Sequence, residues 1–144
     1  MKLKRIRNIA LATALAAVAV IPAVGANASS AASVSMVQTD IAQDGDAAHL
    51  AIATCNGAGA TTGSSLAVAV EGQTTAPGAV AVRVKCGIVM GGRVVRSFQN
   101  ALPGSVAGTA GVAQNLPVAP FTVCADVYAL FSDGAESRNN RCPL

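Results

Sequence analysis

Residues 120–143 read PFTVCADVYALFSDGAESRNNRCP, and this stretch predicts a β-hairpin that closes the fold. Successive side chains of a strand point to opposite sides, so alternate residues share a face. The face that alternation makes apolar holds Phe121, Val123, Ala125, Val127, Ala129 and Phe131. Ser132-Asp133-Gly134 supplies a turn, because Asp bonds to nearby backbone and Gly accepts positive φ. The other strand then runs from Glu136 towards the C-terminus.

The two cysteines of this stretch lie near each other across the predicted hairpin. If Phe131 pairs with Glu136, Cys124 stands opposite Pro143, and Cys142 is one position out of register. A bulge or a one-residue shift of the turn makes the cysteines cross-strand neighbours. We therefore expect a Cys124–Cys142 disulfide, which its loop length makes worth about 3 kcal/mol in the chain-entropy model.

The first 28 residues have the order of a secretory signal peptide. A basic start through Arg7 precedes an uncharged apolar run, 9–21, and a tail that ends Ala26-Asn27-Ala28. The run is shorter than the roughly 20 residues of a membrane span. The sequence therefore predicts a secreted protein, cleaved after Ala28, with Ala31 or Ala32 as alternatives, and no membrane span afterwards.

The basic charge of the chain belongs to this leader. The whole chain has ten basic and seven acidic residues, a net charge of +3 and a pI near 8.9. Four of the ten basic residues precede Asn8, so residues 29–144 keep six against seven acidic ones. The mature chain is nearly neutral, and its charge does not predict binding to nucleic acid or anionic membranes.

Residues 29–144 are expected to form one all-β domain, an antiparallel β-sandwich of seven or eight strands. Val, Ala, Leu and Ile must form its core, because there is no Trp and few aromatic residues. Gly, Ser, Thr and Pro interrupt the apolar segments at the spacing of short strands. The expected strands before the hairpin are 34–39, 47–55, 66–70, 80–88, 94–100 and 105–113. The expected connections are 40–46, 56–65, 72–78, 115–120 and a two-residue turn at Gly91-Gly92.

This pattern of short strands, two disulfides and export resembles the immunoglobulin-like β-sandwich of small exported bacterial proteins. The resemblance implies an architecture and no activity. The Cys…Trp…Cys arrangement of that family is absent, since the chain has no Trp. Thr122 also occupies the place of the family's tyrosine, two residues before the late cysteine.

The four cysteines, Cys55, Cys86, Cys124 and Cys142, predict two disulfides in an oxidising compartment. Three pairings are possible. The hairpin favours Cys124 with Cys142, which leaves Cys55 with Cys86. No pair has the CxxC spacing of a metal site, so no metal or other cofactor is predicted.

The polar residues offer little chemistry. His49 is the only histidine, and no nucleophile motif accompanies it, so a surface or strand-end histidine is the favoured interpretation. Asp40, Asp44 and Asp46 are predicted to lie in a solvated loop, since the Ca²⁺-loop spacing of an EF-hand is absent. An enzyme would have to rely on a carboxylate pair such as Asp126 and Glu136.

A possible binding face consists of Arg83, Lys85, Arg96 and Tyr128. Arg83 and Lys85 share the outward side of their strand, and Arg96 joins them if the Gly91-Gly92 turn has two residues. Tyr128 either anchors a partner or packs over the Cys124 disulfide. The stripe suits an anionic glycan or an acidic protein; without interleaved aromatic residues it does not suit single-stranded nucleic acid.

The sequence thus predicts a secreted, non-enzymatic protein that binds a protein or glycan, or has a structural role in the cell envelope. The alternative is a small secreted inhibitor of an extracellular hydrolase. Its rigid inhibitory loop would be 56–65, 87–92 or 100–104, since rigidity lowers the ordering cost of binding.

Overall fold

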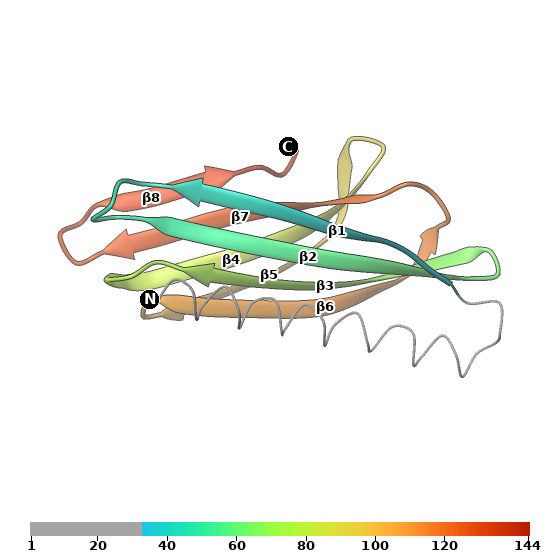
Figure 1. The fold of residues 1–144 in the computed structure, drawn as a ribbon, viewed down its shortest axis with the longest axis horizontal. Helices are drawn as coiled ribbons and strands as arrows, with labels where there is room; N and C mark the ends of the chain where they lie inside the picture. Colours follow the sequence, from blue (N-terminus) through green and yellow to red (C-terminus); the bar gives the residue numbers. More distant parts are fainter. Residues whose placement is uncertain (1–32) are drawn as a thin grey trace.

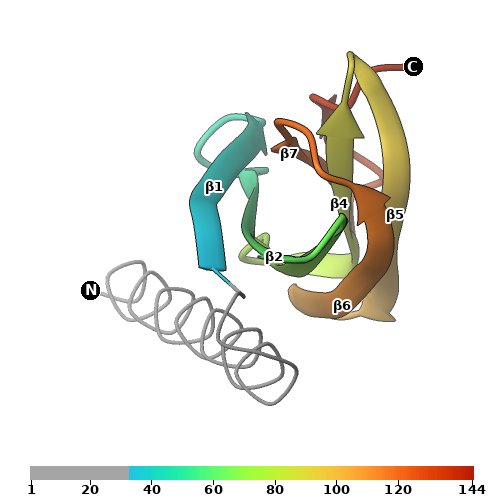
Figure 2. The same ribbon diagram turned by 90° about the vertical axis from the view of Figure 1, so that its right-hand side faces the viewer.

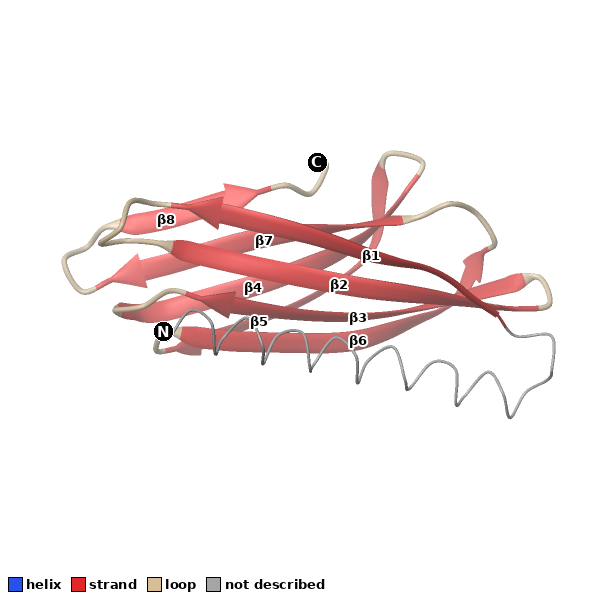
Figure 3. Cartoon of the chain, in the orientation of Figure 1, coloured by secondary structure: helices blue, strands red, loops and turns tan. Residues whose placement is uncertain are grey.

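The structure, a computed structural model, describes residues 33–144, which form eight β-strands (Figures 1 and 3). The predicted signal peptide lies outside the described residues. The strands are β1 Ser33–Asp44, β2 Ala51–Thr62, β3 Ser65–Thr75, β4 Ala79–Met90, β5 Arg93–Pro103, β6 Val106–Pro117, β7 Thr122–Phe131 and β8 Glu136–Asn140. Within this range no helix is long and apolar enough to cross a membrane.

The strands form two antiparallel sheets that face each other, as the end-on view in Figure 2 shows. Sheet A has the order β1-β2-β3-β6, and sheet B has the order β5-β4-β7-β8. This confirms the all-β sandwich of eight strands. In the immunoglobulin arrangement the second strand pairs with the fifth, whereas β2 pairs here with β3. The narrower, immunoglobulin-like relationship therefore stays a prediction.

The core lies between the sheets and consists mostly of Val and Ala. All six residues of the apolar face predicted for 121–131 are buried. Sheet A contributes small residues at the positions that face them. Gly57 and Gly59 of β2 lie so close to β7 that an added Cβ would be 2.6 Å from Val123 Cγ1 and from Phe121 Cε1, respectively. These two glycines let Phe121, just before β7, and Val123 pack against sheet A.

Several predicted connections are strands in the structure. β2 continues to Thr62, so most of the predicted loop 56–65 is wrong, and β1 includes most of 40–46. β3 and β6 likewise extend to Thr75 and Pro117, into the predicted connections 72–78 and 115–120. Runs of Gly, Ala and Thr are typical of loops, but in β2 Gly57 and Gly59 lie where side chains from the facing side of the sandwich leave no room for a Cβ.

Val80 lies on the opposite face of β4 from the one that simple alternation predicts. Strict alternation along 80–88 predicts Val80 on the inward face with Val82 and Val84. The register between β4 and β7 shifts between Ala79 and Ala81, so Ala79 is buried and Val80 is 46% exposed. A bulge of this kind turns the side chains before it to the opposite face.

Both predicted disulfides are confirmed. Cys55–Cys86 joins β2 to β4 and therefore sheet A to sheet B. Cys124–Cys142 fastens the segment after β8 to β7. Leu130, not Phe131, pairs with Glu136, which is the one-residue shift that brings the second pair of cysteines together.

Each disulfide lies over a glycine of a neighbouring strand. An added Cβ on Gly72 would be 2.1 Å from Cys86 Sγ, and one on Gly87 would be 2.7 Å from Cys124 Sγ. Real Cβ atoms do not approach sulfur so closely, so both sites admit only glycine without movement of the disulfide.

Side chains close the two long sides of the sandwich. On one side Phe98 of β5 covers Gly111 of β6, and Asn100 Nδ2 donates a hydrogen bond of 2.9 Å to the carbonyl of Gly108. On the other side the carboxylate of Asp40 in β1 accepts hydrogen bonds from the backbone of Ala125 at 2.9 Å and from Arg141 Nε at 3.0 Å.

Asp44 extends this second closure. Its carboxylate accepts a 2.9 Å hydrogen bond from the backbone N–H of Arg138 in β8. Asp40 and Asp44 therefore join the edge of sheet A to sheet B, and the prediction that they lie in a solvated loop is wrong. Both residues lie on the inward side of an edge strand.

Candidate binding face

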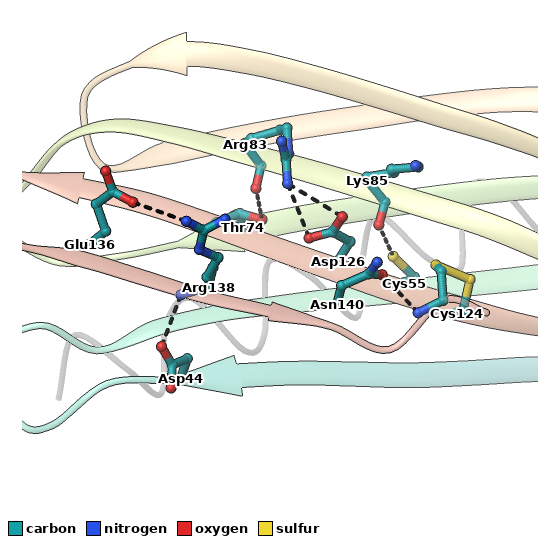
Figure 4. Close-up of polar contacts among 11 residues, drawn as sticks. Asp44, Cys55, Thr74, Arg83, Lys85, Cys124, Asp126, Glu136, Arg138 and Asn140 are labelled. Carbon is teal, nitrogen blue, oxygen red and sulfur yellow. Dashed lines mark hydrogen bonds and ion pairs between the residues drawn. A yellow bond between two sulfur atoms is a disulfide. The ribbon is translucent and has the colours of Figure 1, made fainter. Parts of the chain in front are cut away.

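The outward side of sheet B carries half of the charged residues that lie in strands, and we call it the charged face (Figure 4). The strand register places Lys85 beside Asp126 and Asn140, and Arg83 beside Tyr128 and Arg138. β4 and β7 supply the centre of this face, and β8 supplies one margin.

Arg83, Asp126 and Tyr128 form a compact unit at the centre. Arg83 Nη2 donates to both carboxylate oxygens of Asp126, at 3.2 and 3.3 Å, and the guanidinium carbon lies 5.5 Å from the centroid of the Tyr128 ring. Asp126 is only 6% exposed, so the ion pair is partly shielded from water. Tyr128 therefore packs with Arg83, and the positive charge of Arg83 is largely balanced.

Lys85 and the β8 residue Arg138 carry the positive charge that is not balanced by a close carboxylate. None of the ion pairs found among residues 33–144 involves Lys85. Arg138 and Glu136 form a loose pair at 3.6 Å, with both side chains well exposed. Exposed pairs of this kind contribute little stability, so Lys85 and Arg138 are available to an incoming anion.

Arg96 does not belong to this face. The two-residue turn is confirmed, since Met90 pairs with Arg93. A register shift between Ile88 and Val89 then places Arg96 opposite Ile88, on the side of the strand away from Arg83 and Lys85. Its guanidinium bonds to the carbonyl of Val95 at 2.8 Å. The predicted grouping of Arg96 with Arg83 and Lys85 is therefore wrong. The sequence could not show this, because the bulge has no sequence signature.

A second polar cluster lies at the end of the sandwich where the β1–β2 and β7–β8 connections meet. His49 Nε2 lies 2.7 Å from Asp133 Oδ2, and His49 Nδ1 lies 3.3 Å from Asp46 Oδ1. The ring also packs edge-on against Phe131, with centroids 4.9 Å apart. Sequence reasoning recognised Asp133 only as a turn residue, because 84 positions separate it from His49.

The electrostatics of this cluster reinforce the contact. The hydrogen bond with Asp133 raises the pKa of His49. Backbone N–H groups of His49 and Ala48 lower the pKa of Asp46, and the backbone N–H of Ala135, followed by His49, lowers the pKa of Asp133. The imidazole therefore links the two connections, and the neighbouring carboxylates favour its protonated form.

This cluster lacks the geometry of a catalytic triad. Ser137 is buried nearby, but its Oγ donates a 2.5 Å hydrogen bond to the backbone carbonyl of His49, not to the imidazole. A nucleophilic serine needs the ring nitrogen as its base. No group of His, Cys, Asp and Glu within residues 33–144 has the arrangement of a metal site.

The carboxylate pair considered for an enzyme is not a pair. Asp126 stands opposite Asn140, whereas Glu136 stands opposite Leu130, four residues further along β7. Asp126 is already bonded to Arg83, and Glu136 faces Arg138.

The chain was compared with models of protein families, with curated proteins and with solved structures, and none of them matched. The charged face and the histidine cluster are therefore interpreted from their own geometry.

Proposed function

We propose that the protein is a secreted, non-enzymatic β-sandwich that binds an anionic partner, an acidic protein or a glycan, through the charged face. The single observation that carries this proposal is the combination of a rigid Arg83–Asp126–Tyr128 unit with an unpaired Lys85 beside it. A held aromatic ring next to a free cation offers a flat contact and a charge at low ordering cost.

Export is part of the proposal. Disulfides persist in oxidising compartments, and two of them crosslink residues 33–144. The order of charged, apolar and small residues in 1–28 supports delivery by a signal peptide. Architecture and the inter-sheet disulfide also support the proposed immunoglobulin-like relationship, although the β2–β3 pairing departs from that family's order.

The test is binding to immobilised carboxylated polysaccharide and to cell-wall material, with the matched variants Lys85→Glu and Arg96→Glu. Both reverse one charge, but only Lys85 lies on the charged face. We expect Lys85→Glu to weaken binding by about tenfold or more, which is about 1.4 kcal/mol, and Arg96→Glu to change it little. Equal losses in the two variants, or no binding of wild type to either material, would contradict the proposal.

Of the three loops considered for an inhibitor, only the β4–β5 hairpin at 87–92 remains a candidate inhibitory loop. Residues 56–65 are mostly strand, and 100–104 end β5, but the β4–β5 hairpin projects from the body of the sandwich (Figure 1). An inhibitor would present Gly91-Gly92 and their neighbours to a hydrolase. Slow inhibition of a secreted protease that is abolished by replacing Arg93 would favour this alternative.

A further inference from the structure

β5 is an edge strand of sheet B that pairs with β4 only, and Figure 2 shows it at the margin of the molecule. The backbone N–H of Gly104 donates to the carbonyl of Val80 at 2.8 Å, and this bond fixes the alternation of the β4–β5 ladder. Counted along the register from that bond, every second residue of β5 turns its N–H and C=O away from β4. The residues that offer both groups to the outside of the sheet are Ser97, Gln99 and Ala101.

Side chains bridge the other sheet edges. Between β1 and β8, Asn139 Nδ2 donates a 3.1 Å hydrogen bond to the carbonyl of Gln43. At the edge of β6, the carbonyl of Gly108 accepts the 2.9 Å bond from Asn100 of β5. Within residues 33–144, no side chain of another strand bonds to the backbone of β5. The edge of β5 is therefore open to a further strand.

The open stretch of β5 is short and bounded at both ends. At one end the bulge leaves Val95 unpaired, and its carbonyl already accepts the 2.8 Å bond from Arg96. At the other end Pro103 has no N–H to offer. All residues of 97–101 except Phe98 are exposed. Bulges and prolines limit the pairing of edge strands, so these boundaries suit one short added strand and not an open-ended stack.

The charge around this edge has one sign. None of the seven acidic residues lies in β4, β5 or β6, whereas these strands hold four basic residues, Arg83, Lys85, Arg93 and Arg96. Of these, only Arg83 takes part in an ion pair within the described part of the chain. Lys85 stands beside Gln99 on the charged face, and Arg96 lies on the opposite side of the sheet. Carboxylates on either side of an added strand would therefore meet a cation.

From these observations we propose that β5 receives an extended, acidic segment of another protein, which adds to sheet B as a further strand. A row of N–H and C=O groups that repeats at about 6.8 Å, two residues of a strand, is matched by the backbone of another strand. Main-chain hydrogen bonds supply affinity, and the cations beside the edge select acidic side chains. This inference rests on the proposed function, since it specifies the anionic partner as a polypeptide and adds a contact beside the charged face.

The test uses the disulfide-bonded chain and a peptide of about ten residues in which Thr and Glu alternate, a composition that can extend as a strand. The peptide should protect the amides of Ser97, Gln99 and Ala101 from hydrogen exchange measured by NMR. Protection confined to β7 and β8 would overturn the proposal.

Two control peptides separate backbone pairing from charge. The same peptide N-methylated at every backbone nitrogen keeps its carboxylates but has no main-chain donors, and we expect it to bind at least about tenfold more weakly. A peptide in which Lys replaces Glu keeps its donors and should also bind at least about tenfold more weakly. Equal binding of either control peptide would overturn the proposal.

Gln99→Pro removes the central open N–H, and Gln99→Ala is its matched control. The N–H of Gln99 points away from β4, so neither substitution breaks a bond of the ladder, and proline is accepted at such edge positions. We expect Gln99→Pro to weaken binding of the Thr-Glu peptide at least about tenfold and Gln99→Ala to change it little. Equal affinities of the two variants would contradict the added strand. The N-methylated peptide makes the same comparison on the unaltered protein.

Binding to the carboxylated polysaccharide separates this proposal from the proposed function. A wild-type protein that binds the polysaccharide but not the Thr-Glu peptide overturns the added strand and leaves the charged face standing. Unchanged polysaccharide binding in Lys85→Glu, with the β5 amides still protected by the peptide, has the opposite meaning. If the protein alone protects these amides as its concentration rises, and Gln99→Pro abolishes that protection, the occupant is a second copy and the proposal is wrong.

Discussion

At the scale of single residues, Gly72 is the position where substitution should be most informative. Its Cβ would clash with Cys86 Sγ at 2.1 Å, so Gly72→Ala should destabilise the protein by about 1–3 kcal/mol, as overpacked cores do. Gly108→Ala is the matched control, because its Cβ would meet only a carbonyl oxygen at 3.6 Å. Urea unfolding of the two variants measures the difference; comparable midpoints would show that the disulfide moves freely.

A double-variant cycle sharpens this prediction. If the clash with sulfur is the cause, Gly72→Ala should cost little in a chain that already carries Cys55→Ala and Cys86→Ala. The coupling between the glycine and the disulfide should then account for most of the single-variant cost. An additive result would assign the cost to the backbone of β3 instead.

His49 predicts a pH dependence with a defined direction. Its pKa is raised in the folded state above the ordinary 6.5, so its contribution to stability is complete below pH 6.5 and is lost as the pH rises through the raised value. The pKa values of Asp46 and Asp133 are lowered from the ordinary 3.8, so the stability that these carboxylates contribute is lost only as the pH falls below that value. The urea midpoint of wild type should therefore fall between pH 6 and pH 8.5 more than that of His49→Gln. Identical falls would exclude the cluster as the cause.

At the scale of elements, β1 depends on Asp40 for its attachment to sheet B. Asp40→Ala removes the acceptor of the Ala125 N–H and the partner of Arg141, and we expect a loss of about 1–3 kcal/mol. Asp44→Ala, at a more exposed position with one backbone donor, should cost less. Hydrogen exchange at the Ala125 amide should accelerate in the first variant only. Equal protection in both would show that β1 is held by packing alone.

The sequence predicted the elements unevenly, and the reasons are physical. The β7–β8 hairpin was predictable because its apolar residues alternate without interruption and its turn residues are distinctive. The second half of β2 was not, because Gly57 and Gly59 are selected by the side chains of Val123 and Phe121 on the other sheet. The prediction that Arg96 lies beside Arg83 was wrong because a bulge shifts the register of its strand. The contact between His49 and Asp133 was not predicted because 84 positions separate the two residues. Local pattern carries neither kind of information.

At the scale of the whole molecule, both disulfides contribute to stability, and to different degrees. Their sequence separations of 31 and 18 residues correspond to about 3.7 and 3.2 kcal/mol in the chain-entropy model. Replacing Cys55 and Cys86 by alanine should cost more than this difference suggests, because both are fully buried between the sheets. Thermal unfolding of the two double-alanine variants provides the comparison. A larger loss from the Cys124–Cys142 replacement would mean that the C-terminal segment controls cooperativity.

The same burial predicts the order of reduction. Cys124 and Cys142 lie nearer the surface than the inter-sheet pair, so a mild reductant should open Cys124–Cys142 first. Mass spectrometry after alkylation should then find two labelled thiols before four. Native protein with four free thiols before any treatment would contradict the oxidised state itself.

The inter-sheet crosslink also determines how the molecule responds to tension. A pull on the two ends would pass from Cys55 to Cys86 through sulfur, and from Cys124 to Cys142 likewise, so the enclosed segments 55–86 and 124–142 would bear no load. Fully extended, these two segments together would measure roughly 180 Å at about 3.6 Å per residue. Under tension the oxidised protein would therefore extend only through the chain outside the two disulfide rings, and reduction would lengthen it.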